Sequence, residues 1–281
     1  MAKSENNPEG VSTMSYKYGF IGSGNMSSAL VSALISKVEP QAIALSNRTA
    51  VKAETLSKAT GAVVSTNEEI AKSAKYVVLG VKPQMLETVL EPLKGELKAN
   101  ENPILVTMAA GTKIKTICEM AGGDYPVIRI MPNTPVAVGA GVILISRNSL
   151  VSDEDFETFI GDFEKAGVIV RVEEDMIDAG SVISGCGPAY VYMFIDAMAK
   201  AGESLGLSYE TAATLAKATA RGAALLSETK DESLENLRIA VCSPGGSTIE
   251  GVKSFFESDL DDVVSKALTA AYKRTKELAG E

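Results

Sequence analysis

The chain has 281 residues, 46% of them hydrophobic and 22% charged, with a net charge of −9 at pH 7. This is the composition of a globular protein long enough for two domains, and its acidic balance without a basic cluster argues against nucleic-acid binding. Three widely spaced cysteines suit a reducing cytosol. The absence of histidine removes the commonest acid–base group and metal ligand, so we expect no metal.

The polar N-terminus lacks the apolar core of a signal peptide, so we expect a disordered tail over residues 1–15. The longest uncharged runs, 130–146 and 179–195, contain proline and glycine and are too short to span a membrane. We therefore expect a cytoplasmic protein without a membrane partner.

From residue 16 to 172, apolar segments of strand length alternate with segments of helical periodicity. The predicted strands are 16–22, 42–47, 62–65, 76–81, 103–109, 126–131, 141–146 and 167–172. The predicted helices are 25–37, 49–60, 67–73, 84–97, 113–121 and 153–165. Strands that are apolar on both faces and alternate with helices predict an α/β fold, with a Rossmann-type parallel sheet domain over 16–172.

After Glu173 the strand patterns stop. Two helices hinged near 184–188, an alanine-rich helix over 209–229, and one or two helices over 247–281 are predicted. A helical domain this narrow and apolar completes its core against a second copy. We expect an all-α dimerisation domain over 173–281 and a homodimer; the alternative is a monomer whose helices fold back on the sheet.

The turn between the first predicted strand and helix has the sequence Gly22-x-Gly24-x-x-Ser27. Gly22 permits a tight turn, and Gly24 lets a pyrophosphate approach the backbone at the helix N-terminus. Ser27 replaces the third glycine of this pattern with another small residue. Because the turn opens the first unit of an alternating chain, it indicates a dinucleotide site rather than a plain turn.

The end of the second predicted strand indicates which dinucleotide is bound. NAD sites usually carry a carboxylate there, whereas this chain has Ser46, Asn47, Arg48 and Thr49. Hydroxyl, amide and guanidinium groups suit the 2′-phosphate of NADPH, and NADH stays possible. The alternative, that Asn47–Thr49 merely caps the next helix, is compatible with this role.

Six motifs then occur in a recognisable order: FIGSGNM, GVKPQ, MAAG, RIMPNTP, SGCGPAY and SPGGSTIEGV. Together they resemble the pyrroline-5-carboxylate reductase family, from about Tyr16 to the C-terminus. The resemblance implies NAD(P)H-dependent reduction of the cyclic imine 1-pyrroline-5-carboxylate to L-proline, the last step of proline biosynthesis. It also implies a Rossmann domain, a helical dimerisation domain, and a homodimer or a ring of dimers.

The resemblance also implies the site residues, to which the 2′-phosphate argument adds Arg48. The cofactor-binding set is Ile21, Gly22, Ser23, Gly24, Asn25, Met26, Asn47, Arg48, Asn67, Gly80, Val81, Lys82, Pro83, Met108, Ala109 and Ala110. The substrate-binding set, reached across the dimer interface, is Ser243, Gly245, Gly246, Ser247 and Thr248, with Thr248 as the catalytic donor to the imine nitrogen. Departures from the family pattern are Ser27, Cys186, Cys242 and the lack of proline in 230–238, where Asp231 and Glu232 give no assured substrate-facing acid.

The SPGGST segment interrupts the helical half of the chain. Glycine N–H groups at 245 and 246 are available to a carboxylate, and Ser247 with Glu250 has the spacing of a capping box. A cyclic imine is basic enough to carry a proton near neutrality, so the reaction does not require a histidine acid. The alternative is an ordinary helix–helix turn with a good cap.

Arg129 and Asn133 are candidates for contact with substrate or cofactor, and Asn133 is equally a candidate for bracing its loop. Lys82 is interpreted as a loop residue whose backbone lines the cofactor. A β-hydroxyacid dehydrogenase would need a lysine within 187–199, where there is none. A non-catalytic NADPH sensor or scaffold is compatible with the fold, but has no use for a carboxylate site.

Overall fold

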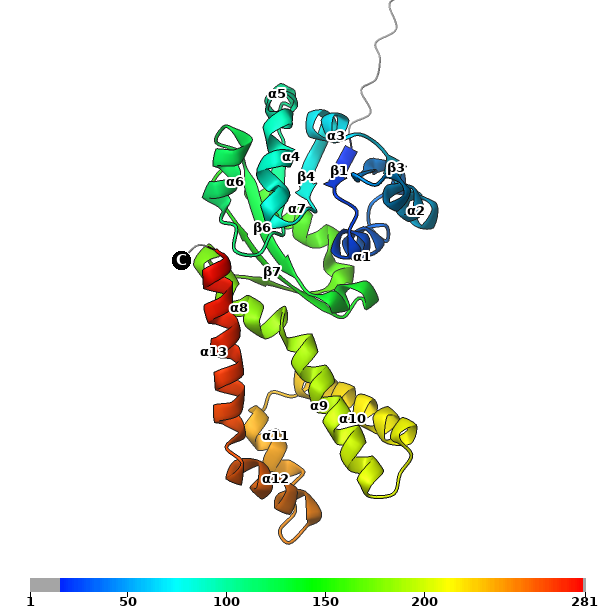
Figure 1. Cartoon of the computed structure of the whole chain (residues 1–281), viewed down its shortest axis with the longest axis vertical. Helices are drawn as coiled ribbons and strands as arrows, with labels where there is room; N and C mark the ends of the chain where they lie inside the picture. The colour runs from blue at the N-terminus through cyan, green and yellow to red at the C-terminus, as the bar shows by residue number, and fades with distance from the viewer. Residues whose placement is uncertain (1–15, 280–281) are drawn as a thin grey trace, which may run out of the picture. The chain divides into compact units, whose positions relative to one another are not determined.

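The structure is a computed structural model that describes residues 16–279 (Figure 1). The predicted tail 1–15 lies outside the described residues. Within them the chain forms two compact units, one of residues 16–181 with 275–279, the other Val182–Arg274. The chain passes between the units within two helices, α8 (Ile177–Ser184) and α13 (Leu260–Leu278).

The first unit is built on an eight-stranded sheet with the order β3-β2-β1-β4-β5-β6-β7-β8. The strands are β1 Tyr16–Ile21, β2 Ile43–Ser46, β3 Val63–Val64, β4 Ala74–Leu79, β5 Ile104–Thr107, β6 Val127–Pro132, β7 Gly141–Arg147 and β8 Gly167–Arg171. The strand order reverses between β1 and β4, and in such sheets this switch point marks the ligand site.

One pairing departs from the predicted parallel sheet. β7 runs antiparallel to β6, while every other neighbouring pair in the described sheet is parallel. The connection 133–140 holds only the short 3₁₀ turn Thr134–Val138, and a parallel return needs a longer crossover.

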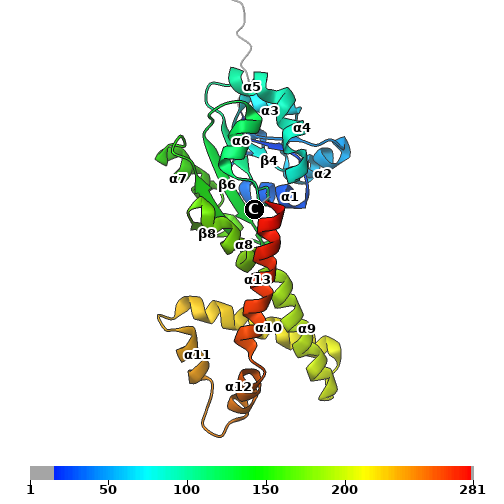
Figure 2. The same ribbon diagram turned by 60° about the vertical axis from the view of Figure 1, so that its left-hand side comes forward.

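Helices cover both faces of the sheet, which confirms the predicted layering (Figure 2). The helices of this unit are α1 Asn25–Leu34, α2 Ala50–Thr60, α3 Asn67–Ser73, α4 Leu86–Leu90, α5 Lys94–Ala99, α6 Ile114–Ala121, α7 Asp153–Asp162, the start of α8 and the end of α13. One hydrophobic cluster packs α1, α2 and α7 against the sheet. A second cluster packs α3, α4, α5 and α6 against it. The predicted helix 84–97 is divided at a 3₁₀ turn containing Pro92, which has no N–H to continue the helix.

Two buried tyrosines bind α7 to the sheet. The rings of Tyr18 and Tyr76 stack with centroids 4.8 Å apart, and both side chains are fully buried. The Tyr18 hydroxyl donates to Asp162 Oδ2 at 2.7 Å, and the Tyr76 hydroxyl donates to the Asp155 carbonyl at 2.7 Å. Burial, then the neighbouring carboxylates, raises the pKa of both phenols.

These tyrosines predict alkaline unfolding. Because the folded state holds both phenols neutral, their stabilisation is complete below pH 10, the ordinary tyrosine pKa, and is lost as pH rises from there toward their folded-state pKa. Well above pH 10 the unfolding free energy should fall by about 1.4 kcal/mol per pH unit for each tyrosine.

Urea titrations at stepped pH should give a shallower alkaline loss for Tyr18→Phe/Tyr76→Phe than for the wild type. Tyr192→Phe, at an exposed position, should follow the wild type. The ion pairs of Lys17 with Asp162 and of Lys75 with Asp155 are present in all these proteins, so the test is the difference between the slopes of the double variant and the wild type. Equal slopes in the double variant and the wild type would contradict the assignment.

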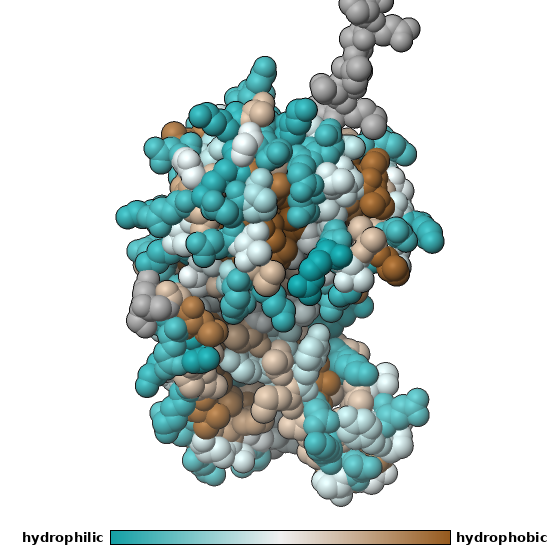
Figure 3. Space-filling model, turned by 45° about the horizontal axis from the view of Figure 1, so that its top comes forward, coloured by the Kyte–Doolittle hydropathy of each residue, from teal (hydrophilic) through white to brown (hydrophobic). Residues whose placement is uncertain are grey.

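The second unit is entirely helical, as predicted. Its helices are the end of α8, α9 Gly187–Ser204, α10 Tyr209–Thr229, α11 Leu234–Ala240, α12 Ser247–Glu257 and most of α13. The helix is interrupted between Ser184 and Gly187, at the predicted hinge. Helix α11 was not predicted from the sequence. Large apolar and aromatic side chains lie exposed along this unit, including Val191, Tyr192, Met193, Phe194, Phe255, Phe256 and Val263. Figure 3 shows hydrophobic residues among hydrophilic ones on the face of the molecule that it presents.

Candidate functional site

The turn between β1 and α1 lies against the end of β4 at a distance that only glycine permits. Gly22 has φ +104°, and a Cβ there would lie 2.7 Å from the Gly80 carbonyl oxygen. A Cβ on Gly80 would lie 2.3 Å from Ser27 Oγ and 2.4 Å from the Gly22 carbonyl oxygen. By contrast, a Cβ on Gly24 would meet no heavy atom within 4 Å. The backbone at Gly24 is therefore open to a ligand.

The N-terminus of α1 is an anion site left open by the chain itself. Gly24 is the N-cap residue, no side chain caps the helix, and its first turn holds no acidic residue. Side-chain oxygens do cap other helices, for example Thr66 on α3 and Ser152 on α7. The uncapped N–H groups and the positive end of the helix dipole suit a pyrophosphate, so these residues fit a dinucleotide.

The end of β2 is hydrogen-bonded to this turn. The Ser23 N–H donates to Asn47 Oδ1 at 3.0 Å, and Asn47 Nδ2 donates to the Thr49 carbonyl at 3.0 Å. The Ser46 hydroxyl donates to Asn67 Oδ1 at 2.6 Å, which links the start of α3 to the same place. Thr49 occupies the N-cap position of α2 but makes no side-chain capping bond.

Arg48 lies beside this network and is exposed. In the described part of the chain, no acidic side chain pairs with its guanidinium. A permanently charged guanidinium next to an uncapped helix N-terminus suits a dinucleotide that carries an additional phosphate on its ribose.

The other predicted cofactor residues follow the next two strands. Leu79 at the end of β4 is in register with Ile21 and with Thr107 of β5, so Gly80–Pro83 and Met108–Ala110 leave neighbouring strand ends. Lys82 is exposed and begins the 3₁₀ turn Pro83–Met85. The structure thus brings the predicted cofactor residues to one edge of the sheet, on both sides of the switch point.

The predicted substrate loop lies in the second unit, between α11 and α12. Gly245 has φ +71°, and the Gly246 N–H donates to the Ser243 carbonyl at 2.9 Å. Ser247 and Thr248 are exposed in the first turn of α12.

The predicted capping box at this loop is wrong. The N-cap of α12 is Gly246, with no side-chain capping bond, because Ser247 is already the first helical residue. Glu250 instead pairs with Lys253 at 2.7 Å, one turn along. The N–H groups at the start of α12 are therefore left without a side-chain cap, as on α1, which suits a carboxylate.

Arg129 and Asn133 both have partners within the first unit. Arg129 is 2% exposed, with its guanidinium 2.7 Å from Asp178 and 3.5 Å from Glu174. Asn133 Oδ1 accepts the Val142 N–H at 2.8 Å, which supports the bracing interpretation. Asp178 and Glu174 were not predicted from the sequence as part of the site. A sequence signal for them did exist: they are two acidic residues four positions apart, at the start of the helical segment that follows the last strand.

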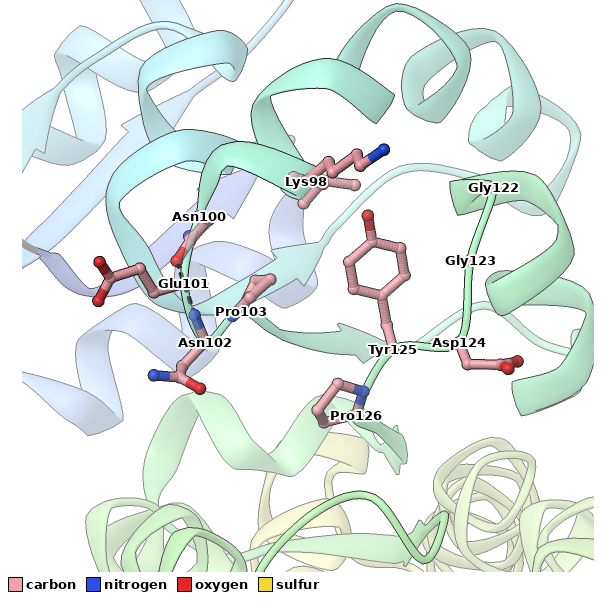
Figure 4. Close-up of a pocket in the computed structure, with 11 residues that line it drawn as sticks. Lys98, Asn100, Glu101, Asn102, Pro103, Gly122, Gly123, Asp124, Tyr125 and Pro126 are labelled. Carbon is pink, nitrogen blue, oxygen red and sulfur yellow. Dashed lines mark hydrogen bonds between the residues drawn. The ribbon is translucent and has the colours of Figure 1, made fainter.

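A shallow pocket of about 430 Å³ lies at the opposite edge of the sheet (Figure 4). It is lined by the segments that precede β5 and β6, including Asn100–Pro103 and Gly122–Pro126. Ligands of such sheets bind at the carboxyl ends of the strands, so this pocket is not the candidate site. Among residues 16–279, no cluster of acidic or cysteine side chains could hold a metal ion.

Comparison with known proteins covers both units. A family model for pyrroline-5-carboxylate reductase dimerisation matches residues 174–278, and one for NADP oxidoreductase, coenzyme F420-dependent, matches residues 17–111. Pyrroline-5-carboxylate reductase from Arabidopsis thaliana is 35% identical over 94% of this chain and 96% of that protein.

Solved structures agree with these matches. A pyrroline-5-carboxylate reductase from Coxiella burnetii is 34% identical, with a TM-score of 0.88 over 94% of this chain and 98% of that one. The pyrroline carboxylate reductase of Plasmodium falciparum, solved with NADP bound, is 30% identical, with a TM-score of 0.81 over the same shares.

The helical stretch Glu174–Ser204 is long and apolar enough, by length and composition alone, to cross a membrane. It is broken between α8 and α9, and it carries Asp178 in a buried ion pair. The dimerisation model covers the whole stretch. Its exposed apolar side chains therefore belong to the region that this family uses for dimerisation.

Proposed function

Because the chain belongs to the pyrroline-5-carboxylate reductase family, we propose that it reduces 1-pyrroline-5-carboxylate to L-proline with NADPH, the last step of proline biosynthesis. The observation that carries the proposal is the pair of uncapped helix N-termini, each behind a glycine turn: α1 for a pyrophosphate and α12 for a carboxylate. A dinucleotide and an anionic substrate need one such site each.

The cofactor-binding residues would each hold a different part of NADPH, according to their position on the sheet. The backbone of Ile21–Met26 would hold the pyrophosphate, Asn47 and Arg48 the 2′-phosphate, and Asn67 the adenosine side. The segments Gly80–Pro83 and Met108–Ala110 would line the ribose and nicotinamide. When bound, NADPH supplies the hydride that adds to the imine carbon. NADH stays possible as a weaker donor.

The substrate-binding residues would hold the substrate carboxylate and donate a hydrogen bond to the imine nitrogen. The N–H groups of Gly245 and Ser247 would bind the substrate carboxylate at the start of α12. The Gly246 N–H, which the sequence predicted to be available to the carboxylate as well, instead closes the turn on the Ser243 carbonyl. The imine nitrogen arrives protonated from solvent, and the π electrons of the C=N bond move onto it as the carbon is reduced. The Thr248 hydroxyl donates to this nitrogen as it becomes an amine.

The assembly proposed is a homodimer, or a ring of dimers, with the substrate loop reached across the interface. The exposed apolar side chains of the helical unit support it, because they are too numerous for a free surface. We propose domain limits of 16–172 and 173–281, a cytoplasmic location suited to three free thiols, and no nucleic-acid or membrane partner. A dissociated, folded monomer should have lost its activity, and full activity in that monomer would contradict the shared site.

The reaction itself is tested by NADPH oxidation with 1-pyrroline-5-carboxylate and, in parallel, by NADP reduction with a β-hydroxyacid. Turnover is expected only with the imine. The one lysine near the β-hydroxyacid position, Lys200, is exposed and pairs with Asp196 at 2.7 Å, which gives that alternative no support. NADPH binding without turnover of the imine would favour a sensor instead.

Arg48 should decide the cofactor preference. Arg48→Ala is expected to lower kcat/KM for NADPH by about 10- to 100-fold, the loss of one charge-assisted phosphate contact, and to leave kcat/KM for NADH unchanged. Lys52→Ala, an exposed cation on the adjacent α2, is the matched control and should change neither. Equal losses with both cofactors would contradict a contact with the 2′-phosphate.

A further inference from the structure

A buried ion cluster lies beside the edge of the sheet that carries the cofactor residues. Arg129 of β6 lies between Asp178 of α8 and Glu174 of the 3₁₀ turn Glu174–Met176, and Lys276 of α13 is 3.7 Å from Asp178 Oδ2. Arg129 and Asp178 are 2% and 4% exposed. Buried ion clusters of this kind are a costly way to gain stability, which suggests another use for this one.

Glu174 connects the cluster to the segment between β5 and α6. Its Oε1 accepts the N–H of Ile114, the first residue of α6, at 2.6 Å. The N-cap residue, Lys113, makes no side-chain capping bond to this helix. Glu174, sixty residues further along the chain, accepts a helix N–H in place of such a cap. Arg129, in turn, is the register partner of Thr107, the last residue of β5.

The segment from Met108 to Lys113, here the nicotinamide segment, is held at three points. At its start the Ala109 N–H donates to Thr107 Oγ1 at 3.3 Å. In its middle Gly111 packs on the end of the chain, because a Cβ there would lie 3.2 Å from the backbone of Ala279. At its far end Glu174 holds Ile114. Two of these three contacts come from residues beyond the sheet.

We infer that Glu174, fixed by Arg129, is a positioning residue that holds the nicotinamide segment in place for the nicotinamide half of the cofactor. The inference rests on the proposed function, which places the nicotinamide against Met108–Ala110. Glu174 acts through the start of α6, and the buried Arg129–Asp178 pair gives its carboxylate a fixed place. Asn47 and Asn67, proposed for the adenosine half, make no hydrogen bond to this cluster within residues 16–279.

The experiment compares Glu174→Ala, Glu174→Gln and the control Glu173→Ala, an exposed acid next in sequence. Two ligands are titrated: NADPH, and 2′,5′-ADP, which lacks the nicotinamide. Glu174→Ala should weaken NADPH binding about 10-fold, leave 2′,5′-ADP binding unchanged, and speed hydrogen exchange of the Ile114 amide at least 10-fold. Glu174→Gln keeps an acceptor oxygen and should restore most of the protection and affinity. The control should match the wild type.

Equal weakening of both ligands in Glu174→Ala would overturn the inference, since it would indicate general damage. An exposed Ile114 amide with unchanged NADPH affinity would overturn it too. Both readouts are taken without the imine, so a wild type that binds NADPH but does not turn over would refute the proposed function and leave the positioning role measurable. A wild type that binds no NADPH would refute both.

Discussion

Gly80→Ala is expected to raise the Kd for NADPH by about 5- to 150-fold. The added methyl would lie 2.4 Å from the Gly22 carbonyl oxygen and 2.3 Å from Ser27 Oγ. The first of these is backbone at the centre of the phosphate turn, so β1 and β4 would have to separate there. Overpacking of this kind costs about 1–3 kcal/mol, and here the strain falls on the residues that hold the pyrophosphate.

Two further variants separate this effect from a general one. Gly95→Ala, on α5, places its methyl where no heavy atom lies within 4 Å and should bind NADPH as the wild type does. Ser27 Oγ is a buried hydroxyl without a hydrogen-bond partner in the described structure, so Ser27→Ala removes one of the two clashes at little cost. Adding it to Gly80→Ala should still not restore binding, because the Gly22 oxygen stays. Normal affinity in Gly80→Ala would contradict the geometry of the turn.

Arg129→Met is expected to lower the unfolding free energy by about 3–5 kcal/mol, the usual cost of removing one partner of a buried ion pair. Asp178, which is 4% exposed, would lose the guanidinium 2.7 Å from its carboxylate and keep Lys276 at 3.7 Å. Urea unfolding of the two proteins at neutral pH measures the difference directly.

Arg171→Met is the matched control for that measurement. Arg171 pairs with Glu157 at 2.6 Å, but both side chains are more than half exposed. The same substitution should therefore cost only about 0–1 kcal/mol there. Adding Asp178→Leu to Arg129→Met should recover part of the loss, because it removes a buried carboxylate that has lost its guanidinium partner. Equal destabilisation by the two arginine variants would contradict a buried cluster.

Local patterns were enough to predict most of the elements. The helices Asn67–Ser73 and Tyr209–Thr229 occur with the predicted bounds, because their apolar spacing is continuous and their ends carry clear signals. The predicted helix 84–97 failed where Pro92 interrupts an otherwise helical pattern. The direction of β7 was missed because strand patterns carry no sign of which way a strand runs.

The site residues also fall into those with a local sequence signal and those whose role depends on a distant segment. Gly22 and Gly24 are local signals, visible in a single turn of the sequence. The reason for Gly80 is not local, since it depends on how closely β4 approaches the turn after β1. The partners of Arg129 are equally distant in sequence, and the capping box at Ser247 failed because helix entry moved by one residue. Residues whose role depends on a distant segment were predicted only through the family resemblance.

The proposed reaction is reduction of the cyclic imine at the loop that precedes α12. Its most direct test is NADPH oxidation with 1-pyrroline-5-carboxylate by the wild type, Thr248→Ala and the matched variant Thr248→Ser. Rapid wild-type turnover is predicted, with kcat about 5- to 150-fold lower in Thr248→Ala and largely kept in Thr248→Ser, which retains the hydroxyl. A wild type that binds NADPH but does not oxidise it with this substrate would contradict the claim.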